Sequence, residues 1–359
     1  MENVLRDWGG EFALTAYDEP SGSYLFVAIH STRLGPAAGG TRIKTYDTPA
    51  DGLLDATRLA EAMTLKMAVA GLPMGGGKSV LAVPGELDPA TRRNLLLRHA
   101  HNVHMLAGNY RTGPDMNTNS ADMDTLNEVT PFAFGRSVEK GGSGSSAPDT
   151  AVGCFHGIVA SVRHAYGDPD LTGKRVLVQG AGAVGAPLAE MLVKAGAHVI
   201  VSDVSLDRVE ALYDTLGVEV VSPAAVLETE CDVFAPCATG GVLRPENIPL
   251  LKCRIVAGAA NNPLSERSDG ELLRAAGILY APDFVINAGG GIHLIGYEAL
   301  GWSQEQVERG LLGIGDTLTE IYRSADAAGI STEEAAERLA HARLDAGPLR
   351  PGLPNDTTH

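Results

Sequence analysis

The chain has 359 residues, enough for two domains of about 150 residues that share one cleft. It contains 28 Lys and Arg against 44 Asp and Glu, a net charge of −16 at pH 7, which argues against nucleic acid or an anionic membrane surface as a partner. Its 43 glycines exceed the usual share of about 7% and indicate many tight turns or close approaches of the backbone to a ligand. No secretion signal and no apolar run of about 20 residues are found, so we expect a cytoplasmic protein.

The first 140 residues mix predicted strands and helices. Apolar residues lie among polar ones over 11–30, around the turn-forming segment 18–23, which predicts a β-hairpin. A Thr-Pro pair opens a helix predicted over 48–71, and an Asp-Pro pair opens a second helix predicted over 88–107. Between the two helices, the apolar segment 79–83 predicts a strand.

A different pattern follows the Gly/Ser-rich segment 141–146, whose composition is typical of a linker. Strand-like segments recur there, several of them separated by helix-length stretches, and they lie at 174–180, 198–203, 218–222, 231–236, 254–260 and 278–283. This alternation predicts a parallel, doubly wound sheet. Capping boxes beginning at Ser303 and Ser331 predict two closing helices, which we expect to pack on the first domain, and 349–359 is expected to be a loose tail.

The segment 180–185, with the sequence GAGAVG, follows one of these strands and opens a helix. In that context the glycines let the backbone approach a pyrophosphate, and the helix start offers amide donors to it. Asp203 closes the next strand about 20 residues further on, where a ribose-binding acid is expected, and no arginine follows until Arg208 to hold a 2′-phosphate. The pattern therefore predicts NAD rather than NADP, and the residues expected to bind it here are Gly180, Gly182, Ala183, Val184, Gly185 and Asp203. The alternative is a tight strand–helix turn in which Asp203 is a helix cap.

Two lysines stand in places that call for an explanation. Lys66 lies on the apolar face of the first predicted helix, where an ammonium group is costly unless an anion pairs with it. That anion is either a substrate carboxylate or an internal acid, unless the side chain reaches solvent from the rim. Lys78 follows three glycines at 75–77, but Leu72 breaks the phosphate-binding pattern that GGGKS suggests. We interpret 75–77 as backbone that approaches a ligand while Lys78 points into a cleft, the alternative being a glycine-rich loop with a solvated lysine.

Asp115 is the third candidate, because a carboxylate beside a lysine can exchange protons with water and an amine. It could equally form a turn or cap a helix near Ser120. The histidines at 99, 101 and 104 do not share one helical face, so we predict no metal site. The four cysteines form no CxxC pair and are expected to be buried free thiols.

Seven segments in order resemble the amino-acid dehydrogenases of the glutamate, leucine, phenylalanine and valine type, and most closely the phenylalanine enzymes. They cover nearly the whole chain and lie at 34–42, 62–80, 108–127, 178–185, 231–242, 256–263 and 281–294. The resemblance implies NAD-dependent oxidative deamination of an L-amino acid, with release of ammonia and a 2-oxo acid.

The resemblance also implies residue roles. Lys66 would hold the substrate carboxylate, Lys78 would polarise the attacking water and the imine carbon, and Asp115 would be the general acid/base. Further contacts to the substrate are implied for Gly40, Pro114 and Asn261, and contacts to the cofactor for Thr150, Cys237, Ala238, Ala259 and Asn261.

The pocket for the substrate side chain follows from the same comparison. Glutamate enzymes carry a lysine where this chain has Ala38 and a hydroxyl residue where it has Leu294, so glutamate has no partner for its second carboxylate. Leucine and valine enzymes carry a leucine at Ala38, and the small Ala38 and Gly291 leave room for a ring. We therefore expect L-phenylalanine or another aromatic amino acid, with leucine or valine as the alternative.

Together these observations predict an α/β protein of two domains. The substrate-binding and oligomerisation domain would cover 1–147 and a C-terminal helix at about 330–345, a doubly wound Rossmann NAD domain would cover 148–329, and a tail would cover 346–359. Two other functions stay open: an NAD-binding sensor without activity, and a 2-hydroxy-acid dehydrogenase that uses His293 as its acid/base. The family resemblance implies a homo-oligomer.

Overall fold

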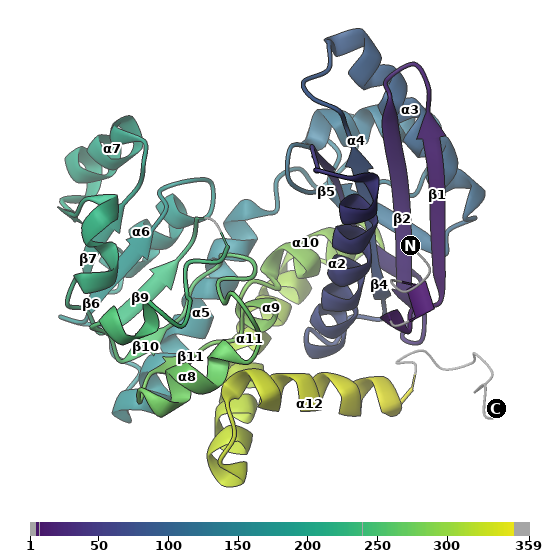
Figure 1. The fold of residues 1–359 in the computed structure, drawn as a ribbon. Helices are drawn as coiled ribbons and strands as arrows, with labels where there is room; N and C mark the ends of the chain where they lie inside the picture. Colours follow the sequence, from purple (N-terminus) through teal and green to yellow (C-terminus); the bar gives the residue numbers. More distant parts are fainter. Residues whose placement is uncertain (1–4, 7, 239, 348–359) are drawn as a thin grey trace. The chain divides into compact units, whose positions relative to one another are not determined.

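The computed structural model of the chain describes residues 5–6, 8–238 and 240–347 (Figure 1). It divides into two compact units. The first runs to Ser145 and includes Leu294–Trp302 and the chain from Ala340 onward, and the second comprises Ser146–His293 and Ser303–Leu339. None of the helices in the described part is long and apolar enough to cross a membrane.

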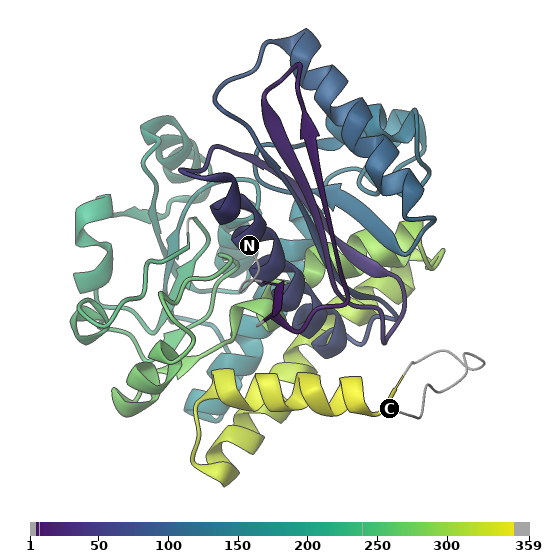
Figure 2. The same cartoon turned by 45° about the vertical axis from the view of Figure 1, so that its right-hand side comes forward.

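The first unit is built on a five-stranded sheet in the order β1-β2-β4-β3-β5. Its strands are β1 (Phe12–Asp18), β2 (Ser23–Ser31), β3 (Ala37–Lys44), β4 (Gly75–Ala82) and β5 (Tyr110–Pro114). The strands β1 and β2 form the predicted antiparallel hairpin, drawn in purple in Figure 2, and β3 is parallel to both β4 and β5. Parallel pairing brings the ends of β3 and β5 to one edge of the sheet.

Helices cover both faces of this sheet because successive strand residues point to opposite sides. Phe26 and Val80 pack against α2 (Pro49–Val69), whereas Leu25 and Leu81 pack against α3 (Pro89–Met105) and α4 (Ser120–Asn127). The predicted caps are present, since Thr48 forms a capping box on α2 and the Asp88 side chain accepts two backbone amides of α3. A short 3₁₀ turn, η1 (Val138–Lys140), precedes the second unit.

The second unit contains the predicted parallel sheet, in the order β11-β10-β9-β6-β7-β8. Its strands are β6 (Arg175–Gln179), β7 (His198–Ser202), β8 (Glu219–Val220), β9 (Val233–Pro236), β10 (Ile255–Val256) and β11 (Leu279–Tyr280), and neighbouring strands in this order pair in parallel. The strands β8, β10 and β11 have two residues each, shorter than the predicted segments, because only those residues make ladder pairs. The α/β prediction with a doubly wound nucleotide-binding sheet is confirmed.

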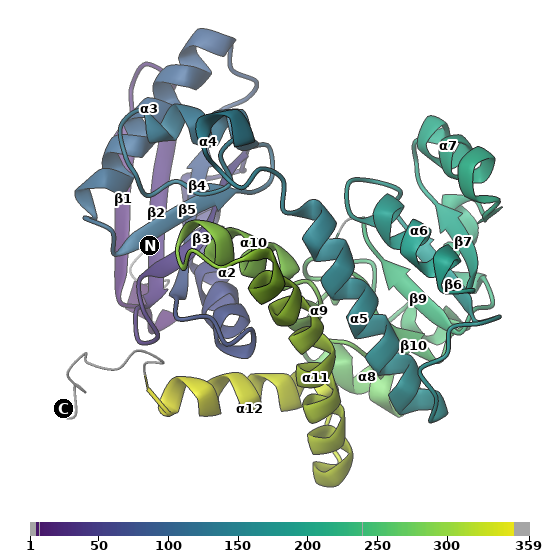
Figure 3. The ribbon, with the colours of Figure 1, turned by 180° about the vertical axis from the view of Figure 1, so that it is seen from behind.

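The helices of the second unit are α5 (Ala147–Tyr166), α6 (Gly185–Lys194), α7 (Leu206–Leu216), α8 (Asp269–Ala275), α9 (Asp283–Ile286) and α11 (Gln304–Ala328). Two 3₁₀ turns, η2 (Pro223–Glu228) and η3 (Ile248–Leu250), lie between its strands. The helix α5 was not predicted. The expectation that α11 packs on the first domain is wrong, because α11 lies beside α5 (Figure 3), where Tyr322 is hydrogen-bonded to Ser161 at 2.7 Å.

Two further helices contain residues of both units, α10 (Gly289–Glu298) and α12 (Thr332–Asp345). The predicted capping box at Ser303 begins α11, and the Ser331 hydroxyl accepts the backbone amide of Glu334 near the start of α12. The tail predicted at 349–359 lies outside the described residues.

Candidate active site

The loop that contains Gly180, Gly182 and Gly185 requires two of its glycines for close backbone packing, and the third leaves the loop open. Gly180 has φ of +103°, and a Cβ there would lie 2.9 Å from the backbone nitrogen of Ala238. A Cβ on Gly185 would lie 1.8 Å from the carbonyl oxygen of Gly180, so α6 can start only with glycine. A Cβ on Gly182 would meet nothing closer than Arg208 Nη1 at 3.9 Å, so this side of the loop is open. The loop therefore fits a pyrophosphate that approaches bare backbone at a helix start.

Asp203 follows β7 and supports this loop. Its Oδ2 accepts the backbone N–H of Ala181 at 2.7 Å, and its Oδ1 accepts that of Ser205 at 2.8 Å. Burial alone would raise the pKa of Asp203, but these backbone hydrogen bonds hold it below its usual value. Asp203 thus accepts backbone amides as a helix cap does, which was the alternative role. Each carboxylate oxygen also keeps a lone pair that can accept a ribose hydroxyl.

The structure corrects the sequence argument about Arg208. That argument left a 2′-phosphate without a nearby guanidinium, yet Arg208 Nη1 lies 3.9 Å from Asp203 Oδ2. The guanidinium is exposed and close to the glycine loop. The expected preference for NAD over NADP therefore rests on the carboxylate of Asp203 and not on the absence of a cation.

Lys78 lies in the middle of β4 and not after a loop. The alternative for residues 75–77 was a glycine-rich loop, but they are buried in β4, between β2 and β3. A Cβ on Gly76 would lie 2.1 Å from the backbone nitrogen of Thr64, so glycine lets α2 pack directly on the strand. The alternative of a solvated lysine is wrong, because the Lys78 side chain is only 6% exposed and its Nζ lies 3.0 Å from Asp115 Oδ1.

Asp115 follows the last residue of β5 and receives two cations. Its Oδ1 faces Lys78, and its Oδ2 accepts the Arg42 Nε–H at 2.8 Å. Burial would raise the pKa of Asp115, but the charges and hydrogen bonds of Lys78 and Arg42 hold it well below its usual range. The turn expected as the alternative exists in the backbone, where the Thr118 amide donates to the Asp115 carbonyl, but the carboxylate points to the cations.

Gly40 makes room for this carboxylate. A Cβ on Gly40 would lie 2.7 Å from Asp115 Cβ and 2.7 Å from the Pro114 carbonyl oxygen. The pairing of Thr41 with Pro114 sets this register between β3 and β5. Gly40, Pro114, Lys78 and Asp115 therefore come together in the first unit, as the sequence predicted they would serve one site.

Three other residues predicted to bind the substrate belong to the first unit and lie on or beside α2, β3 and β5. Lys66 is half-buried in the last turn of α2, the helix that packs on β4. Ala38 is buried in β3, opposite Gly76 on β4. Leu294 lies close to Gly113, the residue before Pro114. A Cβ on Gly113 would lie 3.4 Å from Leu294 Cδ1. The roles predicted for these three residues remain proposals.

The remaining predicted residues lie in the second unit. Cys237 and Ala238 follow β9 beside Gly180, and Asn261 is held by Asn287, whose Nδ2 donates to its Oδ1 at 2.9 Å. Asn287 Nδ2 also donates to the backbone carbonyl oxygen of Ala259 at 3.4 Å. On α5, the Thr150 hydroxyl lies against Gly290, and Gly291 is the next residue of α10.

Several of the histidines and cysteines considered in the sequence make contacts within the protein, and they form no metal cluster in the described residues. His99 is fully buried, its Nε2 lies 3.1 Å from Thr41 Oγ1, and burial lowers its pKa to about 4. His293 Nδ1 lies 2.7 Å from Asp149 Oδ2. No group of three or more metal-ligating side chains is found in the described part of the chain. The cysteines are free as expected, but only Cys154 is buried and the other three are partly exposed.

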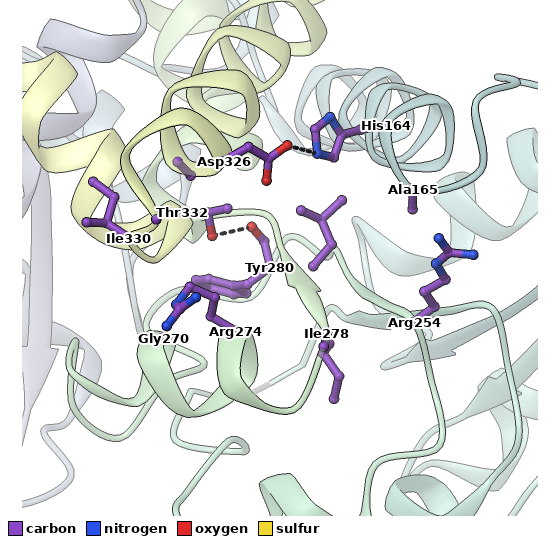
Figure 4. Close-up of a pocket in the computed structure, with 14 residues that line it drawn as sticks. His164, Ala165, Arg254, Gly270, Arg274, Ile278, Tyr280, Asp326, Ile330 and Thr332 are labelled. Atoms are coloured by element: carbon purple, nitrogen blue, oxygen red, sulfur yellow. Dashed lines mark hydrogen bonds and ion pairs between the residues drawn. The ribbon is translucent and has the colours of Figure 1, made fainter.

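A separate hollow of about 370 Å³ lies in the second unit (Figure 4). It is lined by residues that precede β10 and β11, such as Arg254 and Ile278, so it lies at the amino ends of the strands. Its charged groups already have partners: His164 pairs with Asp326 at 3.1 Å, and Arg254 lies over the Tyr166 ring. Dinucleotides bind at the carboxyl ends of parallel strands, so this hollow is not the candidate site.

Sequence analysis did not identify three residues that shape the site. Arg42, Asp55 and Asn287 each bond to a predicted site residue or to its partner. Arg42 stands in the segment 34–42 that carried the resemblance, but its partner Asp115 is 73 residues away, a separation no local pattern can bridge.

The chain matches two family descriptions. Residues 23–131 match the "Glu/Leu/Phe/Val dehydrogenase, dimerisation domain" and residues 205–346 match "Glutamate/Leucine/Phenylalanine/Valine dehydrogenase". Leucine dehydrogenase of Thermoactinomyces intermedius is 40% identical over 345 residues, which is 96% of this chain and 93% of that protein. Valine dehydrogenase of Streptomyces albus is 40% identical over 342 residues, 94% of this chain and 93% of that protein.

A solved structure shares the fold over its full length. The crystal structure of L-tryptophan dehydrogenase from Nostoc punctiforme superposes with a TM-score of 0.83 at 36% identity, covering 96% of this chain and 99% of that one. These relatives are named for leucine, valine and tryptophan, so the expected likeness to phenylalanine dehydrogenase in particular is not supported. Domains of this family use NAD(H). The chain belongs to the glutamate/leucine/phenylalanine/valine dehydrogenase family and is an NAD-dependent amino acid dehydrogenase.

Proposed function

We propose that the protein catalyses the reversible oxidative deamination of a branched aliphatic L-amino acid, leucine or valine, with NAD. The observation that carries this proposal is the buried ion pair of Lys78 and Asp115. A buried lysine and carboxylate in contact can move protons between water and an amine, which is the chemistry deamination requires. The substrate preference is supported by the names of the relatives and by the apolar Ala38 and Leu294, which offer nothing to a second carboxylate.

The overall reaction converts the amino acid, water and NAD⁺ into the 2-oxo acid, ammonium, NADH and a proton. Bound NAD supplies the acceptor for the hydride that leaves the substrate α-carbon. In this scheme the Lys66 ammonium holds the substrate carboxylate, and Lys78 orients the water that attacks the imine carbon. Asp115 takes a proton from that water and returns one to the departing ammonia.

The second unit would hold the cofactor. The open backbone at Gly182 and the start of α6 suit the pyrophosphate, and Asp203 suits a ribose hydroxyl. Thr150 and the segment 259–261 would contact the nicotinamide end. Asn287 would keep the Asn261 amide in one orientation, because its Nδ2 donates a hydrogen bond to Asn261 Oδ1.

We further propose that the protein is a homo-oligomer that uses the first unit. Strand β1 is an edge strand of its sheet, and Phe12 and Tyr17 on it are 44% and 51% exposed. An unpaired edge with exposed aromatic side chains favours pairing with a second copy. The dimerisation-domain description that matches 23–131 supports this proposal.

An aromatic amino acid is the second candidate substrate. Ala38 and Gly291 are small, and the tryptophan dehydrogenase relative shows that the family includes an enzyme named for a large ring. A panel of L-leucine, L-valine, L-phenylalanine, L-tryptophan and L-glutamate, each with NAD and with NADP, separates the candidates by the rate of NADH formation. Faster turnover of leucine or valine supports the proposal, and faster turnover of an aromatic amino acid transfers it to the second candidate. Preference for glutamate contradicts both.

A further inference from the structure

Arg42 connects two carboxylates at the edge of the first unit's sheet. Its Nε donates to Asp115 Oδ2 at 2.8 Å, and its Nη1 donates to Asp55 Oδ2 at 2.9 Å. The Arg42 and Asp55 side chains are 13% and 11% exposed, so both bonds are shielded from water. Screening is weak at this depth, and these contacts hold the guanidinium in one orientation.

Asp55 is itself fixed from two sides. The Tyr46 hydroxyl donates to Asp55 Oδ2 at 2.6 Å, and the exposed Arg58 donates to Oδ1 at 3.0 Å. Burial, and the hydrogen bond to Asp55, raise the pKa of Tyr46 above its usual value, so the phenol keeps its proton and remains a donor. Tyr46 and α2 thereby anchor the far end of the Arg42 guanidinium.

The shielded charges of this cluster are equal in number. Lys78 and Arg42 carry two positive charges, and Asp115 and Asp55 carry two negative charges, while a third cation, Arg58, is 58% exposed. Arginine stays protonated at every working pH, whereas a lysine and a carboxylate in contact can pass a proton between them. The permanent positive charge on Arg42 stabilises the ionised form of Asp115, to which it donates a hydrogen bond.

We propose that Arg42, anchored by Asp55, is a positioning residue that keeps Asp115 ionised and turns its Oδ1 toward Lys78. Lys78 occupies Oδ1 and Arg42 occupies Oδ2, so the carboxylate cannot rotate without breaking a charged hydrogen bond. The groups that face Asp115 are Lys78 from β4, Arg42 from β3 and the buried Tyr110 phenol from β5. The expected kinetic effects of this inference rest on the proposed function. The expected ionisation of the Asp115 carboxyl does not.

The first test measures that state without turnover. The carboxyl carbon of Asp115, assigned by its loss in Asp115→Asn, is titrated by ¹³C NMR in the full-length protein and in Arg42→Met. Removing the guanidinium should raise the pKa of Asp115 by at least about one unit, a tenfold gain in proton affinity. An unchanged titration in a folded Arg42→Met protein would falsify the inference, whether or not the protein deaminates any amino acid.

The second test uses the pH profile of kcat/KM with the best amino acid of the panel. Arg42→Met should move the acid limb to higher pH and lower kcat at least about tenfold, while the KM for the amino acid changes little because Lys66 binds its carboxylate. Arg42→Lys should restore much of the acid limb, since it returns the charge, but not the full kcat. A rise in KM alone would assign Arg42 to substrate binding and overturn the positioning role.

A milder variant and a matched control guard against misfolding. Asp55→Asn keeps the Arg42 charge but weakens its anchor, so kcat should fall while the acid limb moves less than in Arg42→Met. Arg58→Met removes the solvent-side partner of the same Asp55, 58% exposed, and should leave both parameters at wild-type values. If Asp55→Asn behaves like Arg58→Met, the anchor has no role and the inference fails.

Discussion

At the scale of single residues, the proposed function assigns the chemistry to Lys78 and Asp115. Lys78→Ala should lower kcat by roughly 10²–10⁴-fold, the usual contribution of a positioned acid/base group, because the water loses its orienting cation. The variant should still bind NADH, since the glycine loop lies in the other unit. Steady-state kinetics and NADH fluorescence titration measure both quantities. Lys194→Ala, a 71% exposed lysine, is the control, and near-native turnover in folded Lys78→Ala contradicts the assignment.

Leu294 provides a test of the side-chain pocket. Leu294→Ala removes apolar volume beside Gly113 and should favour larger substrates. A few missing methyl groups change specificity by about 1–3 kcal/mol, so the ratio of kcat/KM for phenylalanine over valine should rise roughly tenfold or more. Leu312→Ala, at a 51% exposed leucine of α11, should leave the ratio unchanged. An unchanged ratio in Leu294→Ala would place the pocket elsewhere.

The sequence pointed to the two proposed reacting residues but not to the residues that position them. Lys78 and Asp115 were identified because a cation on a glycine-rich backbone and a carboxylate in a polar loop stand out locally. Arg42 and Asp55 do not stand out locally. Arg42 contacts Asp115, which is 73 residues away, and Asp55, which is 13 residues away. The expectation of phenylalanine is not supported by the names of the relatives, and space at Ala38 and Gly291 says little until the facing side chains are known.

At the scale of elements, the contact of α2 with β4 depends on Gly76. Gly76→Ala would place a methyl 2.1 Å from Thr64 and 2.5 Å from the Ala60 carbonyl, forcing the helix off the strand. We expect a loss of about 3 kcal/mol or more in the free energy of unfolding, at or beyond the upper range for overpacked cores. Urea denaturation measures it. Gly85→Ala, where a Cβ meets nothing within 4 Å, should change stability by no more than about 0.5 kcal/mol.

Glu333 makes the second unit sensitive to pH near the start of α12. Its side chain is buried, and burial, then Asp283 and Glu337, raise its pKa to about 8. The folded state therefore binds a proton that the unfolded state has lost, so stability falls as the pH rises from the ordinary glutamate range through about 8. Glu333→Gln should remove this loss.

The difference in Tm between Glu333→Gln and wild type should grow by a few degrees from about pH 5 to about pH 9. Glu334→Gln, at the next residue, removes an exposed carboxylate that pairs with Arg338 and should show no such trend. A constant difference for Glu333→Gln would mean that the carboxyl is ionised in the folded protein across this range.

Elements with local start signals were predicted well. The capping boxes at Thr48 and Ser303 and the cap at Asp88 mark helices that the structure contains. The start of β4 was missed because glycines are poor strand formers, and only the packing of α2 demands them there. The helix α5 was missed because Gly153 and Gly157 interrupt its apolar pattern, although they let Ile314 and Leu318 of α11 pack closely.

At the scale of the whole molecule, the alternation of strands and helices predicted the parallel sheet, because each crossover needs a helix. The chain's return to its first unit through Leu294–Trp302 and the segment from Ala340 was only partly anticipated. The salt bridge of Arg33 with Asp345, at 3.2 Å, and the bond of Arg343 to the Val69 carbonyl join that last segment to the first unit. Such long-range pairings leave no periodic signal in the sequence.

The central claim is that this protein deaminates an amino acid with the Lys78–Asp115 pair. The most direct measurement follows NADH oxidation with the 2-oxo acid of leucine, with and without ammonium, in wild type and Lys78→Ala. We predict oxidation that requires ammonium and yields leucine in wild type, and its near-complete loss in the variant. Oxidation without ammonium would indicate a 2-hydroxy-acid dehydrogenase, and NADH binding without turnover of this 2-oxo acid would exclude deamination of leucine; either result contradicts the proposed function.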